Sequence, residues 1–220
     1  MKRNIDIKEI SDGKLYTAND MVKADCHDCE GCWDCCTGMG NSIVLDPMDI
    51  WRLTSNLEMD FQTLLEQYIE LNVVDGLILP NLKLSGDKEA CGFLNEKGRC
   101  SIHTFRPGIC RLFPLGRFYE ENGFKYFLQV HECPKKDRSK VKIKKWLGIP
   151  NLKAYEQYII DWHNFKKQCE QALEELEEEH KKILILLVLK TFYQTAYSKD
   201  DFYEEFYKRL EYVRETVFGQ

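Results

Sequence analysis

Apolar residues recur every three or four positions over the last third of the chain. This spacing is typical of amphipathic helices, in which one face packs on a core and the other faces water. The pattern therefore predicts helices from about Lys140 onward. The first apolar stripe comprises Tyr155, Tyr158, Ile159, Trp162, Phe165, Cys169, Leu173 and Leu176, and the second comprises Phe202, Phe206, Leu210, Val213 and Val217.

Two helix starts are predicted nearer the N-terminus. Asp46 precedes Pro47; aspartate is a favoured N-cap residue, and proline suits the first helical position. Asp60 is a second N-cap candidate, followed by apolar residues at helical spacing as far as Ile69.

Three hairpins are predicted between these helical parts. One turns at Asp75-Gly76, a dipeptide that favours a tight two-residue turn. The second turns at Glu96–Gly98, between Cys91 and Cys100. The third turns at Glu121–Gly123, between two aromatic-rich runs.

The composition excludes several classes of protein. The 220-residue chain is 44% hydrophobic and 30% charged, with a net charge of −5, so nucleic acid is not expected as a partner. Its longest strongly apolar run, Ile183–Leu189, is far shorter than the roughly 20 residues of a membrane helix. The first 25 residues contain no apolar stretch resembling a secretory signal. We therefore expect a cytoplasmic protein without a membrane partner.

Cysteine changes this ordinary picture, because the chain has 10 cysteines. Thiols stay reduced in the cytosol, so a disulfide framework is disfavoured there. The side chains of the adjacent Cys35 and Cys36 diverge, which also suits a compact disulfide ladder poorly. The cysteine content therefore predicts metal binding.

The cysteines fall into two constellations and one separate residue. C-x2-C spacing lets two thiolates reach one ion from a tight turn. Three such thiolates with a remote Cys-Pro resemble the ligand pattern of [4Fe–4S] proteins, but four thiolates from two loops satisfy zinc equally well. Zinc and iron, including an iron–sulfur cluster, both remain open. The sets are Cys29-x2-Cys32-x2-Cys35-Cys36, with Cys26 upstream at the same spacing; Cys91-x8-Cys100-x9-Cys110; and Cys133-Pro134.

These motifs, with Cys91-Gly92-Phe93-Leu94, Cys100-Ser101-Ile102-His103 and Arg106-Pro107-x2-Cys110-Arg111-x2-Pro114, resemble the YkgJ-type cysteine-cluster family. That family is described as zinc- or iron-chelating, and a related domain occurs in flagellin lysine N-methylases. The resemblance covers roughly residues 26–136 and leaves Cys26 and Cys169 outside its cysteine set. It implies eight metal ligands: Cys29, Cys32, Cys35, Cys36, Cys91, Cys100, Cys110 and Cys133. Eight thiols exceed one four-ligand site, so two sites, or one site with additional structural thiols, are both open.

The predicted fold class is α+β. A tail over residues 1–25 precedes a small metal-stapled, cysteine-rich domain over 26–136, built from short hairpins and helices. A helical C-terminal region follows over 137–220. Cys169 lies on an apolar helix stripe and is expected in the core.

Other residues near the cysteines carry weaker signals. His103 and His131 are spaced to join a mixed Cys/His zinc site, although a hydrogen-bonding role beside the ligands is favoured. Pro107 is expected to shape the turn that presents Cys110, with Arg106 and Arg111 pairing with thiolate charge. The roles of Cys26 and His103 are left open.

The sequence does not reveal a catalytic constellation such as a phosphate-binding loop or a nucleophile elbow. The first hypothesis is a cytosolic protein that binds zinc or iron through several cysteines. The second is an iron–sulfur-dependent redox or protein-modifying enzyme, as the methylase relationship suggests. The third is a structural zinc module that presents its helices to a protein partner. Whether the chain is an enzyme is left open.

Overall fold

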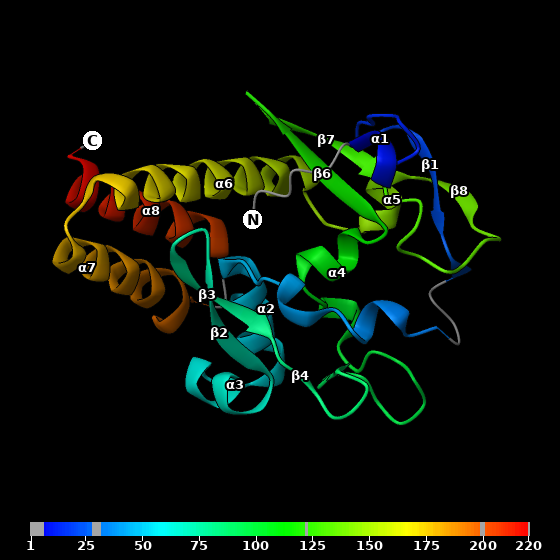
Figure 1. Ribbon diagram of the computed structural model, residues 1–220, viewed down its shortest axis with the longest axis horizontal. Helices are drawn as coiled ribbons and strands as arrows, with labels where there is room; N and C mark the ends of the chain where they lie inside the picture. Colours follow the sequence, from blue (N-terminus) through cyan, green and yellow to red (C-terminus); the bar gives the residue numbers. More distant parts are fainter. Residues whose placement is uncertain (1–6, 28–31, 122, 199–200, 220) are drawn as a thin grey trace. The chain divides into compact units, whose positions relative to one another are not determined.

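The computed structural model describes residues 7–27, 32–121, 123–198 and 201–219 (Figure 1). Helices and short paired strands alternate along the chain, which confirms the predicted α+β class. The helices are α1 (Ile7–Ile10), α2 (Pro47–Leu57), α3 (Phe61–Gln67), α4 (Gly108–Leu112), α5 (Ile143–Leu147), α6 (Leu152–Glu175), α7 (Glu178–Leu189) and α8 (Phe202–Phe218). The strands are β1 (Met21–Asp25), β2 (Ile69–Val74), β3 (Leu77–Leu82), β4 (Leu84–Ser85), β5 (Ala90–Cys91), β6 (Leu115–Glu120), β7 (Gly123–Leu128) and β8 (Ser139–Lys142). Short turns of helix within the described residues are η2 (Asp34–Cys36), η3 (Gly40–Ser42), η4 (His103–Phe105) and the π-helical η5 (Lys190–Gln194).

The chain divides into two compact units whose segments alternate along the sequence. The first comprises Met1–Gly40, Leu84–His103 and Gly108–Asp161, and the second comprises Asn41–Lys83, Thr104–Pro107 and Trp162–Gln220. Among the described cysteines, all but Cys169 belong to the first unit. The described cysteines that are predicted to bind metal therefore all lie in the first unit.

The hairpin β6–β7 supplies much of the core of the first unit. Its strands pair in continuous register from Leu115↔Leu128 to Glu120↔Gly123, which confirms the hairpin predicted there. Gly116 lies opposite Phe127, and a Cβ on Gly116 would come within 2.2 Å of the Phe127 ring, so glycine is required for this pairing.

A second strand pair in the first unit was not predicted. β1 and β8 pair antiparallel, with Met21 opposite Lys142 and Asp25 opposite Ser139 (Figure 1). The helical pattern expected from about Lys140 therefore begins only at Ile143 in α5. The reason is non-local: more than 110 residues separate the two strands, and a hydrophobic pattern within either one does not reveal its partner.

Local signals account for the first helices of the second unit. Asp46 Oδ1 accepts a hydrogen bond of 2.9 Å from the Asp49 N–H, and the Asp49 carboxylate accepts one of 3.1 Å from the Asp46 N–H. This reciprocal capping box confirms the helix start at Asp46-Pro47. Asp60 caps α3 by accepting a hydrogen bond of 2.8 Å from the Thr63 N–H, but the helix ends at Gln67, and Ile69 begins β2 instead.

The β2–β3 hairpin turns at Asp75-Gly76, as predicted. Both residues have positive φ, 50° and 83°, which is the requirement of a type I′ turn.

The core of the second unit is aromatic. Trp162 stacks on Phe165, with ring centroids 5.5 Å apart, and also contacts the rings of Phe192 and Phe206. Cys169 lies in the same helix and is fully buried, as expected for a core residue. On α8, Phe202, Phe206, Leu210 and Val213 of the predicted stripe are also buried.

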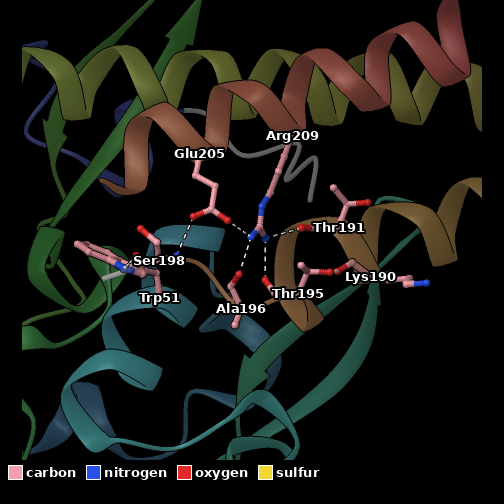
Figure 2. Close-up of polar contacts among 8 residues, drawn as sticks. All are labelled: Trp51, Lys190, Thr191, Thr195, Ala196, Ser198, Glu205 and Arg209. Carbon is pink, nitrogen blue, oxygen red and sulfur yellow. Dashed lines mark hydrogen bonds and ion pairs between the residues drawn. The ribbon is translucent and has the colours of Figure 1, made fainter. Parts of the chain in front are cut away.

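One arginine holds the end of the π-helical turn η5 (Figure 2). The Arg209 guanidinium donates hydrogen bonds of 2.7 Å to the carbonyl oxygens of Thr191, Thr195 and Ala196, and it also contacts the Glu205 carboxylate. It lies over the Tyr197 ring, 3.7 Å from the centroid. These contacts satisfy carbonyl groups that the end of a helix leaves without partners.

Within the part of the chain that the structure describes, no helix is long and apolar enough to cross a membrane.

Candidate metal centre

Cys35 and Cys36 lie in one tight turn, η2. The Cys36 N–H donates to the Trp33 carbonyl at 2.8 Å, and the Thr37 N–H donates to the Asp34 carbonyl at 3.3 Å. A hydrogen bond also joins the two thiols. The turn thus holds two sulfur atoms side by side.

A short backbone pairing brings this turn to the second cysteine segment. Thr37 forms an antiparallel bridge with Ala90, and the Gly38 N–H donates to the Glu89 carbonyl at 3.1 Å. The bridge thereby joins two segments far apart in the sequence, one directly after Cys36 and one directly before Cys91.

The segment from Cys91 to Cys100 is a turn closed by a single bridge between Leu94 and Cys100. Asn95 organises the turn, since its side-chain oxygen accepts hydrogen bonds from the N–H groups of Lys97 and Arg99 at 3.0 and 2.9 Å. The predicted turn at Glu96–Gly98 is therefore present, although it is flanked by one bridge rather than by two full strands.

Trp33 packs directly against this turn. Gly98 has a φ of +69°, and a Cβ on it would lie 2.7 Å from Cε3 of Trp33. The close approach couples the segment carrying Cys32 and Cys35 to the segment carrying Cys91 and Cys100.

Cys110 joins these residues from α4. The pKa of the Cys36 thiol is raised, first by its hydrogen bond with Cys35, then by burial and by the negative charges of Cys35, Cys110 and Cys100. Burial likewise raises the pKa of Cys91, and the charges of Cys100 and Cys35 add to that effect. Such charge effects weaken with distance, so these thiols belong to one region of the first unit. We call Cys35, Cys36, Cys91, Cys100 and Cys110 the first thiol group.

A different set of cysteines surrounds Cys133, which lies in the loop between β7 and β8. Burial raises the pKa of its thiol, and the charges of Cys26 and Cys32 raise it further; the Lys135 N–H and the Arg138 charge lower it. Cys26 is 3% exposed and follows directly after β1. We call Cys26, Cys32 and Cys133 the second thiol group.

The predicted ligands thus fall into two groups according to which thiol charges act on one another's pKa. Five belong to the first thiol group, whereas Cys32 and Cys133 belong to the second; Cys29 lies outside the described residues. Cys26, which the sequence analysis left out of the set, joins the second group. The spacing Cys26-x2-Cys29-x2-Cys32 was the available signal for it.

Among the described residues, the sulfur atoms of each group do not converge on one point where a metal ion could be coordinated. Over residues 7–27, 32–121, 123–198 and 201–219, no three Cys, His, Asp or Glu side chains converge as a formed metal site. Each of the nine cysteines in those ranges carries a thiol and not a disulfide. The eight-cysteine ligand set therefore stays a prediction, while its donor chemistry, soft sulfur atoms, suits zinc and iron alike.

The other candidate residues lie around these groups. The His103 N–H donates to the Cys100 carbonyl at 3.3 Å, whereas His131 is exposed in the β7–β8 loop. Arg111 Nη1 donates to the Leu147 carbonyl at 3.2 Å, so this part of its guanidinium serves the end of α5 rather than a thiolate.

Comparison with protein families assigns this region. Residues 28–134 match the CxxCxxCC family model, described as a putative zinc- or iron-chelating domain. This segment is similar to the CxxCxxCC domain. The match is consistent with the YkgJ-type resemblance. No curated protein and no solved structure gives a significant match to the chain.

The CxxCxxCC domain begins after Cys26 and ends after Cys133. It therefore contains the first thiol group entirely, but only two of the three members of the second. Cys169 lies outside the domain, in the second compact unit.

Proposed function

We propose that this protein binds zinc or iron through cysteine thiolates of its CxxCxxCC domain, with the first thiol group as the principal site. The observation that carries the proposal is the match of residues 28–134 to the putative zinc- or iron-chelating family. The bridge between Thr37 and Ala90 supports it, because it joins the turn of Cys35 and Cys36 to the segment of Cys91, and a chelating site requires such contacts between distant segments.

The electrostatics of the first thiol group support a cation there. The pKa of Cys36 is raised chiefly by its hydrogen bond with Cys35 and that of Cys91 chiefly by burial, and repulsion from other thiolates adds to both shifts. A bound divalent metal removes the repulsion, because coordination stabilises the thiolate form. When bound, the metal would act as a cross-link between the three segments.

A cross-link of this kind would stabilise a region with little regular structure of its own. β4 and β5 have two residues each, and the Cys91–Cys100 turn is closed by one bridge. Metal ligation of such segments contributes directly to the free energy of folding. Removal of the metal is therefore expected to destabilise the segments of the first thiol group more than the β6–β7 hairpin.

The reducing cytoplasm is the compartment we propose for this function. Thiolate ligands must escape oxidation, and cytosolic glutathione and thioredoxin keep thiols reduced. The nine described cysteines, all thiols, are compatible with that setting.

The test is metal analysis of protein purified without oxygen, combined with an acid-labile sulfide assay and an absorption spectrum. Zinc without colour supports a zinc site, whereas a brown protein absorbing near ~400 nm with labile sulfide supports an iron–sulfur cluster. Cys36→Ser should lower the metal content, and Cys169→Ala, in the other compact unit, should not. Wild-type protein with neither metal near stoichiometric amounts would contradict the proposal.

A further inference from the structure

Helix α7 carries apolar side chains on two opposite sides. It contains the apolar run Ile183–Leu189, which reaches every side of the helix because successive residues are about 100° apart. On one side Leu184 and Val188 are buried, and α7 contacts β3 and α8 of the second unit. On the other side Ile183 and Leu186 are 57% and 60% exposed. A helix that is apolar all round is normally covered all round, so the exposed side of α7 suits a contact with another protein.

A charged residue lies one helical turn beyond each end of the exposed apolar pair. Glu179 comes four positions before Ile183, and Lys190 comes four positions after Leu186; both are exposed. Lys190 caps the end of α7 with helical φ and ψ of −63° and −51°, so helical spacing holds across all four residues. Their successive spacings of four, three and four are those of a coiled-coil seam, which places the four residues on one side of the helix.

Neither of these two charges is neutralised by a neighbour within the described part of the chain. Glu179 and Lys190 form no ion pair there, whereas the adjacent Glu178 pairs with Lys181 at 2.9 Å. Figure 2 shows the Lys190 side chain extending away from Arg209. Both charges are therefore available to a second molecule.

We propose that the side of α7 formed by Glu179, Ile183, Leu186 and Lys190 binds the same side of a second copy of this chain, with the two helices antiparallel. A two-fold axis between Ile183 and Leu186 would set each of these residues against the other in the second copy. The same axis would set Glu179 of each copy against Lys190 of the other. The surface is thus complementary to itself in both its apolar centre and its charged ends.

The charges also select the direction of the pair. Parallel helices would bring Glu179 against Glu179 and Lys190 against Lys190, and like charges across an interface are unfavourable. The antiparallel pair turns both contacts into attractions. This inference is independent of metal binding, because α7 lies in the second unit and the described cysteines predicted to bind metal lie in the first.

The size of the contact indicates a weak dimer. Helix α7 has 12 residues, and one helix face of that length is smaller than the standard protein interface of about 1,600 Å². We therefore expect a dissociation constant of roughly 10–100 μM.

The experiment is sedimentation equilibrium of the full-length protein at roughly 5–500 μM, a range that spans the expected dissociation constant. A reductant excludes dimers linked by disulfides. Glu179→Lys and Lys190→Glu should each weaken the dimer about tenfold, because each creates two repulsive contacts. The double variant Glu179→Lys/Lys190→Glu should restore the dimer to within about threefold of the wild type, since both attractions form again with exchanged charges.

Two further variants separate the apolar centre from general charge effects. Leu186→Gln should weaken the dimer about tenfold, and it should leave the monomer folded because Leu186 is exposed. Lys153→Glu makes the same charge change as Lys190→Glu at an exposed position of α6 and should keep the wild-type dissociation constant. Circular dichroism checks the folding of each variant.

A zero-length cross-linker that joins a carboxylate to an amine provides a second measurement on the wild type. Glu179 and Lys190 are 11 positions apart, which separates them by about 16 Å along one helix. A cross-link between them therefore has to join two molecules, and mass spectrometry of the digested dimer should identify it.

A wild-type protein that stays monomeric over the whole concentration range would overturn the proposal. So would a dimer that Leu186→Gln leaves unchanged, since its contact would lie elsewhere. Failure of the double charge exchange to restore the dimer, or a wild-type dimer without the cross-link from Glu179 to Lys190, would overturn the antiparallel pairing.

Discussion

Trp33 lies so close to Gly98 that a Cβ on the glycine would meet its ring at 2.7 Å. Gly98 also has a φ of +69°, a conformation that costs a residue with a side chain about 1 kcal/mol. Gly98→Ala is therefore expected to lower the free energy of unfolding by about 2–3 kcal/mol, because strain and displacement of Trp33 add. Trp33 adjoins Cys32 in the sequence, so bound metal should fall as well. Thermal unfolding and metal analysis measure the two effects.

Gly86 provides the matched control. Its φ is +72°, but a Cβ on it would meet nothing within 4 Å. Gly86→Ala should therefore show the backbone strain alone, about 1 kcal/mol, with full metal content. If Gly86→Ala and Gly98→Ala changed the free energy of unfolding and the metal content equally, the contact between Gly98 and Trp33 would not stabilise the metal-binding region.

Local sequence signals predicted the elements whose stabilising contacts are themselves local. The start of α2 could be predicted because Asp46, Pro47 and Asp49 make the capping contacts among themselves. The β2–β3 turn is specified by Asp75-Gly76 in the same way. The presence of a thiol-rich region was equally visible, since cysteine type and spacing carry that information directly.

The grouping of the thiols could not be predicted, because it depends on contacts between distant segments. Cys26 directly follows β1, whose partner strand β8 is more than 110 residues away in the sequence. The bridge between Thr37 and Ala90 joins the turn of Cys36 to the segment of Cys91. The hydrophobic pattern of a single segment does not indicate which distant segment it pairs with. Cys29 lies outside the described residues, so its place in either group stays a prediction from spacing.

Substitution of Arg209 is expected to lower the free energy of unfolding more than substitution at most other positions of the second unit. Three backbone carbonyls accept hydrogen bonds from its guanidinium, which is largely buried over the Tyr197 ring. Arg209→Ala should lower the free energy of unfolding by about 2–4 kcal/mol, because charged hydrogen bonds are lost and carbonyls lose their partner. Arg209→Lys should recover part of this, since lysine keeps the charge but not the planar fork. Urea denaturation measures both changes.

The neighbouring Lys208 tests whether charge alone explains the effect. Its ion pair with Glu204 is exposed on the same helix, α8. Lys208→Ala should leave the free energy of unfolding nearly unchanged, as is usual for a surface pair. A loss at Lys208 comparable to that at Arg209 would contradict the anchoring role of the arginine.

Cys169 should give the protein a specific sensitivity to alkali. Burial raises the pKa of its thiol from 9.0 to about 12. Between these values the unfolded chain releases the proton while the folded chain retains it, so stability falls as pH rises, by up to about 1.4 kcal/mol per pH unit. Urea denaturation between pH 8 and 10.5 should show a shallower decline for Cys169→Ala than for the wild type. Parallel declines would contradict this assignment.

Metal uptake by the first thiol group should be coupled to proton release. The pKa values of Cys36 and Cys91 are raised, Cys36 chiefly by its hydrogen bond with Cys35 and Cys91 chiefly by burial. Both thiols therefore hold their protons at neutral pH in the absence of metal, and zinc must displace them. The apparent affinity for zinc should rise with pH, by about tenfold per pH unit for each thiol that must ionise.

Competition with a chromophoric chelator between pH 6 and 8 measures this slope, and calorimetry in buffers of different ionisation enthalpy counts the protons released. Cys91→Ser should release about one proton fewer than the wild type, because one thiol has been removed from the group. Cys169→Ala should keep the wild-type slope, since its thiol lies in the other compact unit. An affinity that does not change with pH would show that the ligands are already ionised before zinc arrives, which would contradict the raised pKa values of Cys36 and Cys91.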